Sequence, residues 1–569
     1  MSAEADSVVF ENSVMDHSDP ALFNERKINF ITDSTSNGSG VFSSGQISFD
    51  LSTFSSQNWQ SLNEAYIEFP VKLTAKLTRV ATGTGAAGSI CGAFTTVLKN
   101  GFHQWINSSQ LIVNGQTIQS QQPFENVAAQ YRILSGWSQD TLQKWGKTCN
   151  VVLDDCTADT QTTATSISAI GLNNAPYATV ATSSRGFDAV NNQPVLANRG
   201  LAGRQQLLNA DTAAATLANT ILGSAGFINA GKSNVGRLTS INNGINTDLY
   251  SQFIMATVRV KDLFDINEFP LVKNMKGYMY LTFNSAQTTI TGGADISLVA
   301  SAPTTTLTGL TCPYNVITSS AALPTGGLIT GENGGAAGES PIITITGTVD
   351  GSSTGAIAGS GPILTNARLL MPYYNANPRT DSALSKVQRF RTLEKITNPF
   401  GIAANGTANY TLTVGVPNPR KLILLPLLSN LGSSTDFTNP EMSCFDTAPA
   451  TSSPFARISQ LQITVANKPL FQYPLDYDAE VWFNEISQDG ANGAKVDEMT
   501  SGLLTSALWE NHRYYAIDLA RRLESDDGMS RSVQVSCKNP SNFAMKVIAI
   551  LFYEKHWEIN TNTCMIQSV

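Results

Sequence analysis

The sequence predicts an all-β protein with two antiparallel β-sandwich domains in one chain. Three observations lead to this prediction. Strand-length segments with period-two alternation occur in both halves, a weak internal repeat recurs about 350 residues apart, and charged residues make up only 14% of the chain. An average soluble protein has about 25% charged residues, so much of this surface is suited to contact other protein.

The strand prediction depends on clean alternation between apolar and polar residues. In the segment 46–51, Ile47, Phe49 and Leu51 alternate with polar residues, and the segment 66–73 has the same pattern. Such alternation is typical of strands with one buried and one solvated face. Further strands are expected at 28–32, 110–113, 253–260, 278–283, 342–349, 387–396, 409–414, 421–427, 458–465, 513–519, 532–537 and 544–553.

The internal repeat pairs the segment from Ser109 to Tyr131 with the segment from Ser459 to Ile486. Each copy reads as a strand, an Asn-containing turn, a second short strand, a proline and then a one-face helical stripe. Apolar residues at three- and four-residue spacing predict a helix that covers one end of a sandwich. A period of this length indicates two similarly built domains rather than a small repeat unit.

This pattern divides the chain into four parts. Residues 1–24 are expected to form an N-terminal arm, and residues 25–290 the first sandwich with an insertion at about 150–248. Residues 291–385, rich in Gly, Thr and Ser, are expected to form an excursion between the domains. Residues 386–569 are expected to form the second sandwich and a C-terminal tail. Long loops of this kind are usually functional or exposed.

The charge distribution argues against direct genome binding. The net charge is −8, and the first 24 residues contain five acidic residues but no Lys or Arg. Because phosphate neutralisation dominates non-specific affinity for nucleic acid, we expect no nucleic-acid-binding arm. An acidic N-terminus without an apolar stretch predicts no signal peptide, and no apolar run approaches the ~20 residues of a transmembrane helix.

The seven cysteines are scattered and form no C-x-x-C pair, which favours free thiols in a reducing compartment, although Cys149 and Cys156 could pair across a short loop.

Several segments resemble the double jelly-roll major capsid proteins of eukaryotic DNA viruses, in particular the virophage and Polinton-like lineages. The resemblance is one of ordered pattern over about half of the chain. The stretch VRVKDLFDINEFPLVKNMKGYMYLTF and the stretch SRSVQVSCKNPSNFAMKVIAILFYE carry it most specifically. The resembling segments are 45–73, 98–145, 258–283, 459–486 and 502–553.

The resemblance implies a fold of two eight-stranded antiparallel jelly-roll sandwiches in one chain, with short helices and long inserted loops. It implies a homotrimer with a pseudo-hexameric outline that tiles an icosahedral shell together with penton or minor capsid proteins. It places the protein in the virion, assembled inside the host cell. It implies no enzyme activity, no catalytic residues, no cofactor and no metal.

Three glycine-rich motifs fit the patterns of nucleotide or catalytic sites. Residues 226–233 fit a P-loop with Lys232 and Ser233, but the following residues make a poor helix. Residues 83–88 fit G-x-G-x-x-G without an acidic residue about 20 positions on. Residues 351–355 fit G-x-S-x-G without a following helix. We therefore expect all three to be loops.

Other candidate groups lack the spacing that their chemistry needs. The four histidines form no H-E-x-x-H motif, and His103 and His512 lie among aromatic residues, which favours a structural role. The acidic groups Asp476–Asp478–Glu480 and Glu524–Asp526–Asp527 lack EF-hand spacing. Paired carboxylates for glycoside hydrolysis depend on the fold and stay open. The alternative functions are a β-sandwich host-attachment or glycan-binding virion protein, and an enzyme.

Overall fold

The computed structural model describes most of both predicted sandwiches. The first 21 residues and most of the long insertions lie outside the described residues. The described residues are 22–35, 42, 45–54, 58–78, 89–90, 94–153, 205–206, 233–238, 247–266, 268–291, 304–308, 313–318, 329–330, 342–352, 365–428, 456–488, 502–506, 509, 513–519 and 529–569.

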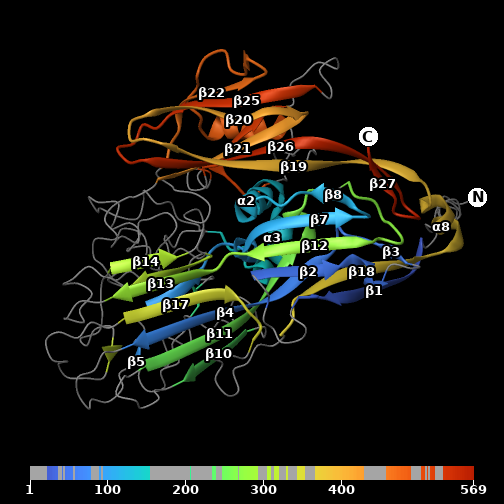
Figure 1. Ribbon diagram of the computed structural model, residues 1–569, viewed down its shortest axis with the longest axis horizontal. Coiled ribbons are helices and arrows are strands. Elements are labelled where there is room, and N and C mark those ends of the chain that lie inside the picture. The colour runs from blue at the N-terminus through green and yellow to red at the C-terminus, as the bar shows by residue number, and fades with distance from the viewer. Residues whose placement is uncertain are drawn as a thin grey trace, which may run out of the picture.

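The first sandwich consists of two antiparallel sheets that face each other (Figure 1). One sheet has the order β1-β18-β4-β11, and the other has the order β2-β12-β7-β8. Their bounds are β1 Phe23–Thr32, β18 Arg368–Ala376, β4 Tyr66–Thr78, β11 Thr247–Arg259, β2 Gln46–Asp50, β12 Gly277–Phe283, β7 Ile106–Val113 and β8 Gln116–Gln119.

The second sandwich has the same construction. Its sheets have the orders β19-β26-β21-β24 and β20-β25-β22-β23, and a short strand, β27, pairs with the end of β26. The bounds are β19 Val387–Ile402, β26 Met545–Asn560, β21 Pro419–Leu428, β24 Tyr515–Asp518, β20 Thr407–Pro417, β25 Ser530–Lys538, β22 Ser459–Val465, β23 Lys468–Pro469 and β27 Ile566–Ser568.

The strands of the two sandwiches have the same connectivity. When the eight main strands of each are numbered in chain order, one sheet contains strands 1, 8, 3 and 6 and the other contains strands 2, 7, 4 and 5. This order is the jelly roll, an antiparallel double-sheet architecture built from two Greek keys. The prediction of two eight-stranded jelly rolls in one chain is therefore confirmed.

The first sandwich is extended at one end by additional strands. Beyond its pairing with β18, strand β4 continues against β17 (Ile342–Val349), which pairs with β13 (Ala286–Thr291), which in turn pairs with β14 (Thr304–Thr308). On the opposite edge, β10 (Ser233–Leu238) pairs with β11. Further short strands are β3 Trp59–Gln60, β5 Ser89–Ile90, β6 Phe94–Leu98, β9 Gln205–Gln206, β15 Tyr314–Thr318 and β16 Ile329–Thr330.

This extension changes the interpretation of residues 291–385. Strands β17 and β18 lie within that segment, which was expected between the domains, and both hydrogen-bond to β4 of the first sandwich. The segment therefore contributes the eighth main strand of the first jelly roll. In the second sandwich the matching connection between β25 and β26 is a tight turn, held by the side chain of Asn539, which donates to the carbonyl of Phe543 over 2.7 Å.

The helices connect strands at the sandwich ends. The α-helices are α2 Glu125–Gly136, α3 Gln139–Cys149, α7 Val260–Leu263, α8 Pro378–Leu384 and α9 Ala479–Gln488, and the 3-10 helices are η2 Leu51–Phe54 and η3 Phe102–Trp105. Helix α2 follows β8, and α9 follows β23, at equivalent places in the two wirings. The strand–turn–strand–helix order of the internal repeat is thus present in both sandwiches.

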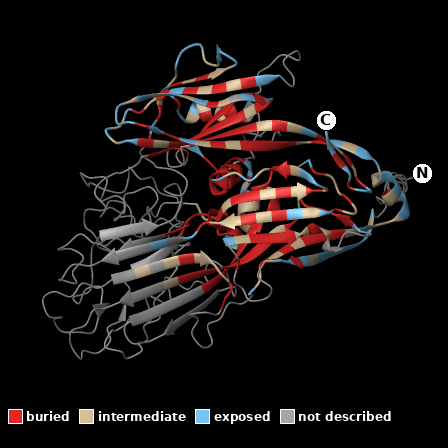
Figure 2. Ribbon diagram, in the orientation of Figure 1, coloured by how far each residue is buried: buried red, intermediate tan, exposed pale blue. Residues whose placement is uncertain are grey.

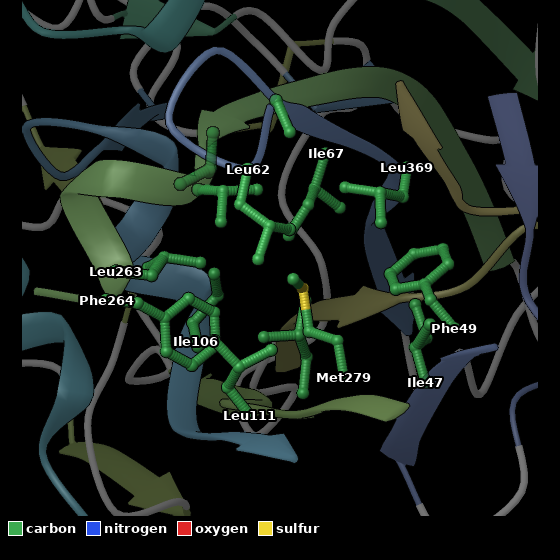
Figure 3. Close-up of a cluster of buried hydrophobic side chains, with 14 of the residues drawn as sticks. Ile47, Phe49, Leu62, Ile67, Ile106, Leu111, Leu263, Phe264, Met279 and Leu369 are labelled. Carbon is green, nitrogen blue, oxygen red and sulfur yellow. The ribbon is translucent and has the colours of Figure 1, made fainter. Parts of the chain in front are cut away.

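The core of the first sandwich is formed by the inward faces of both sheets (Figure 3). Ile47, Phe49 and Met279 from one sheet meet Ile67 and Leu369 from the other, and all five are fully buried. Figure 2 shows the burial concentrated in the middle of each sandwich. Period-two alternation therefore identified the inward residues of these strands correctly.

The outward face of β4 differs from its prediction. Glu68 and Lys72 were expected to face solvent, yet they are only 4% and 8% exposed. Arg368 of the neighbouring strand donates to Glu68 at 2.7 Å, and Lys72 lies 3.8 Å from Asp350. Strand β4 is paired on both sides, and each of these buried polar residues lies beside an opposite charge.

Gly277 begins β12 in a conformation that few other residues adopt. Its φ angle is +151°, and a Cβ atom there would lie 2.0 Å from the carbonyl oxygen of Ile112 on the paired strand β7. We therefore expect Gly277→Ala to lower the free energy of unfolding by about 2–3 kcal/mol, since backbone strain and displacement of a central strand add together. The measurement is the shift of the urea midpoint.

Gly115→Asn is the matched control for this change. Gly115 has φ +79° in the turn between β7 and β8, a Cβ added there would meet no atom within 4 Å, and Asn tolerates this region. The control should change the stability by less than about 0.5 kcal/mol. Equal effects of the two substitutions would contradict the steric argument.

Candidate functional site

The described residues place the most unusual chemistry at the junction between the two sandwiches. Helix α2 belongs to the first sandwich by chain order, yet Val127, Ala128, Tyr131 and Leu134 are buried in the core of the second. Phe124, which precedes the helix in the left-handed region with φ 62°, joins them. Figure 1 shows α2 lying between β7 and the second sandwich. The helix was expected to cover the end of a sandwich, and these side chains place it against the core of the second sandwich.

Tyr131 is the central aromatic residue of this contact. Its ring packs edge-on against Trp482 of α9, with 5.9 Å between ring centroids, and it lies equally close to Tyr514. All three rings are at most 1% exposed. Edge-to-face aromatic packing of this kind adds to the burial of apolar area. The two helices of the internal repeat therefore meet in one core.

The second sandwich likewise contributes residues to the core of the first, at the other end of the junction. Phe390 from β19, Trp557 and Ile559 from β26, and Ile566 from β27 belong to the core of the first sandwich. Phe390 packs edge-on against Phe269, with 5.3 Å between ring centroids. The backbone N–H of Lys273 donates to the carbonyl of Thr561 over 2.8 Å. Each sandwich thus completes the core of the other.

Fully buried charges lie beside the apolar contact. The carboxylate of Glu125, the first residue of α2, forms a close ion pair with Lys395 of β19 and accepts from Arg132 over 3.2 Å. Ser109 and Gln119 also donate to it, over 2.7 and 3.1 Å. Glu125 is 0% exposed and Lys395 is 1% exposed. One acidic residue therefore holds cations from both sandwiches.

The protonation states follow from burial and charge. Burial by itself would raise the pKa of Glu125, but the charges of Lys395 and Arg132 outweigh it, so the pKa is lowered and the carboxylate is ionised. Burial lowers the pKa of Lys395 to about 8, against the opposing effect of Glu125. At neutral pH the pair is charged on both sides.

A second ionic contact fixes the helix α7 against the end of α2. Arg259 donates to both carboxylate oxygens of Asp262 over 2.8 Å, and the indole N–H of Trp137 donates to the same group over 3.0 Å. The guanidinium also lies 4.4 Å from the centre of the Trp137 ring. Paired and stacked in this way, a buried Arg can be accommodated without penalty from an unpaired charge.

His103 lies in the same region, on η3. Its Nε2 is 2.6 Å from Oε1 of Gln130, and the ring is 2% exposed. Burial lowers the pKa of His103 to about 4, so the ring is neutral at neutral pH. The neighbours Gln104 and Asn126 extend this hydrogen-bond network along α2.

Asp265 is a buried acid whose protonation we expect to depend on ordinary pH changes. Burial raises its pKa from 3.8 to about 6, opposed by Arg132, Lys421 and Arg391. The folded state therefore binds this proton more tightly than the unfolded state does. Its contribution to stability is fully present below about pH 4 and is lost as the pH rises through 6.

Asp265→Asn is therefore expected to stabilise the protein at pH 7.5 relative to the wild type, by about 1–3 kcal/mol. The difference between the two proteins should shrink as the pH falls to 4, where the wild-type carboxyl is protonated. Urea unfolding at several pH values measures it. Glu480→Gln, at the solvent-facing start of α9, controls for the loss of one carboxylate. A difference that does not vary with pH would contradict the assignment.

The glycine-rich motifs are placed as follows. Ser233 begins strand β10, so the residue that a P-loop would put on a helix lies on a strand. Residues 83–88 and 226–232 lie outside the described residues. Gly351 follows β17, where a Cβ would meet the carbonyl of Thr365 at 1.9 Å, and Ser353 lies outside the description.

The remaining candidates are spread over the molecule. His556 is half exposed and lies 3.6 Å from Glu554, while His17, His512 and the acidic group 524–527 lie outside the description. Asp476 accepts from the backbone N–H of Gln460 over 3.0 Å. Cys149, Cys537 and Cys564 are buried, and Cys156 is not described. The described part of the chain brings no three His, Cys, Asp or Glu side chains together as a metal site.

Sequence reasoning did not identify Glu125, Lys395 or Asp265 as buried. Glu125 begins a helix, where an exposed acid is common, and Lys395 lies in an otherwise alternating strand. Both are buried where the two sandwiches meet. None of the helices within the described ranges has the length and apolar character that crossing a bilayer requires.

No protein-family model and no characterised protein sequence matches this chain. Solved structures do align with it. A cryo-EM structure of the Sputnik virophage aligns at a TM-score of 0.47 and 12% identity, covering 96% of this chain and 89% of the other. The mavirus major capsid protein aligns at 0.42 and 11%, covering 95% and 90%. The Faustovirus major capsid protein aligns at 0.43 and 10%, covering 95% and 91%.

Proposed function

We propose that this chain is the major capsid protein of an icosahedral virus and acts as a structural protein rather than an enzyme. Three copies form a capsomer with a pseudo-hexameric outline, and capsomers tile the shell. The observation that carries the proposal is the identical wiring of two jelly rolls in one chain. The chain passes from the first jelly roll to the second through residues 377–386, between β18 and β19.

The physical reason is the symmetry of a closed shell. A shell needs the same contacts many times, and repeated contacts are provided by symmetric arrangements of one subunit. A chain with one sandwich offers three similar units in a trimer, whereas a chain with two offers six. Six similar units around an axis fill a surface with few gaps, which suits a capsomer.

The junction supports the same function. Each sandwich contributes apolar residues to the core of the other, and charges from both are buried at Glu125. These contacts hold the two units at one fixed relative orientation. Domains joined only by a flexible linker would move relative to each other. A capsomer that must fit its neighbours on every side requires the fixed arrangement.

The proposed place of the protein is the virion, assembled inside the host cell, with penton or minor capsid proteins as partners. The acidic first 24 residues make direct genome condensation by this segment unfavourable. Genome packaging is then the task of other virion components.

The test is the assembly state of the purified chain. Light scattering after size-exclusion chromatography should give a particle of three 60.8 kDa chains, and negative-stain images should show six-cornered particles. A persistent monomer would overturn the proposal. A monomer that also binds glycans would support the host-attachment alternative, and polysaccharide turnover would support an enzyme.

A further inference from the structure

Three exposed apolar residues from distant parts of the sequence lie next to helix α8 or to the end of the strand pair that follows it. Leu22, Val387 and Met565 are 56%, 56% and 71% exposed. The N–H of Asn377, next to α8, donates to the carbonyl of Leu22 over 3.2 Å. Val387 is paired with Asn560, whose N–H donates to the carbonyl of Met565 over 2.9 Å. We call Leu22, α8, Val387 and Met565 the terminal surface; Figure 1 shows α8 and β27 at the same, right-hand end of the molecule.

The terminal surface carries positive charge as well. Arg379 on α8 and Lys386, which precedes β19, both reach solvent. Two acidic residues on the neighbouring elements are already engaged, since Asp381 of α8 pairs with Lys273 and Glu558 of β26 pairs with Arg389. Within the described ranges, neither Arg379 nor Lys386 forms an ion pair. The surface therefore combines apolar side chains with an excess of cations.

Residues 1–21 join the chain directly at this surface. They contain an apolar group, Val8, Val9 and Phe10, followed by Val14 and Met15, and five acidic residues without a single Lys or Arg. Their composition complements the surface in both respects. Phe10 is twelve residues before Leu22, so an extended chain between them spans at most about 40 Å, enough to reach any part of the surface.

We propose that residues 4–16 cover the terminal surface of their own chain. The apolar residues of the segment bury Leu22, Val387 and Met565, and its acids neutralise Arg379 and Lys386. Attachment at Leu22 favours the segment of the same chain over any other occupant, because tethering gives it a high effective concentration at the surface. Exposed apolar residues clustered with charge are otherwise typical of an interaction site.

A photo-crosslinking experiment tests this proposal on the assembled protein. Phe10 is replaced by p-benzoylphenylalanine, and unlabelled and ¹⁵N-labelled chains are mixed before assembly. Mass spectrometry should find the segment linked to peptides that contain Lys386, Val387 or Met565, with both peptides of each link carrying the same isotope. Links of mixed isotope would assign the surface to a neighbouring copy and overturn the proposal. Links elsewhere, or none, would overturn it too.

Charge reversal tests the electrostatic part. Arg379→Glu combined with Lys386→Glu should lower the crosslink yield about fivefold, and adding Glu11→Lys with Asp16→Lys should restore it. The control is Lys144→Glu with Lys147→Glu, which makes the same change in net charge at solvent-facing positions of α3. The control yield should stay within about twofold. Equal losses in both double variants would refute a specific contact with the terminal surface.

Discussion

Replacing Tyr131 with alanine is expected to destabilise the second sandwich, although the residue belongs to a helix of the first. The ring is 1% exposed and packs against Trp482 and Tyr514. Removal of a buried aromatic side chain leaves a cavity and costs about 3–5 kcal/mol. Because α2 is shared between the cores, the loss should appear in both sandwiches.

Hydrogen exchange measured by mass spectrometry separates the two sandwiches in this experiment. In the Tyr131→Ala variant, hydrogen exchange should accelerate by a similar factor in β22 and β24 as in β7. The free energy of unfolding in urea should fall by the full loss of about 3–5 kcal/mol. The control is Tyr278→Ala, since that ring is 45% exposed on β12 and should cost less than about 1 kcal/mol. Faster exchange limited to the first sandwich would show that α2 does not support the second core.

Glu125→Leu is expected to have an effect of similar size for an electrostatic reason. The substitution leaves Lys395 and Arg132 buried without their shared anion. Removal of one partner of a buried ion pair typically costs about 3–5 kcal/mol, because the remaining charge is not compensated. Urea unfolding of the purified chain measures the loss.

A double variant distinguishes charge from shape. Glu125→Leu with Lys395→Met replaces the ion pair by apolar side chains of similar size, which is often neutral or stabilising. The double variant should therefore recover part of the stability that the single variant loses, because Lys395 is no longer a buried unpaired charge while Arg132 still lacks its anion. If the two losses simply add, Glu125 and Lys395 are not energetically coupled, and their ion pair does not stabilise the junction.

The sequence predicted the strands well because their inward residues alternate without interruption. The prediction succeeded in β2 and β4, where Ile47, Phe49, Ile67 and Phe69 are all fully buried. It also found the repeat, since β7–β8–α2 and β22–β23–α9 keep the same order in both sandwiches. These features are local in the chain, and local patterns are what a single sequence records.

The sequence missed features that depend on residues far apart in the chain. Strand β18 contains Pro372 and follows a Gly-rich stretch, so it resembled a loop, yet it pairs with β1 and β4. Glu68 faces outward by alternation but is buried by Arg368, 300 residues later. Such burial is decided by tertiary contacts that alternation along one strand does not contain.

The sharing of α2 also has a consequence during protein synthesis. Tyr131 leaves the ribosome long before Trp482, its partner in the second core, has been made. At roughly 5–20 residues per second, the 350 residues between them take on the order of 20–70 s to translate. During that time the apolar side of the helix has no second sandwich to enter. A nascent chain with such a surface is a substrate for chaperones until its last strands emerge.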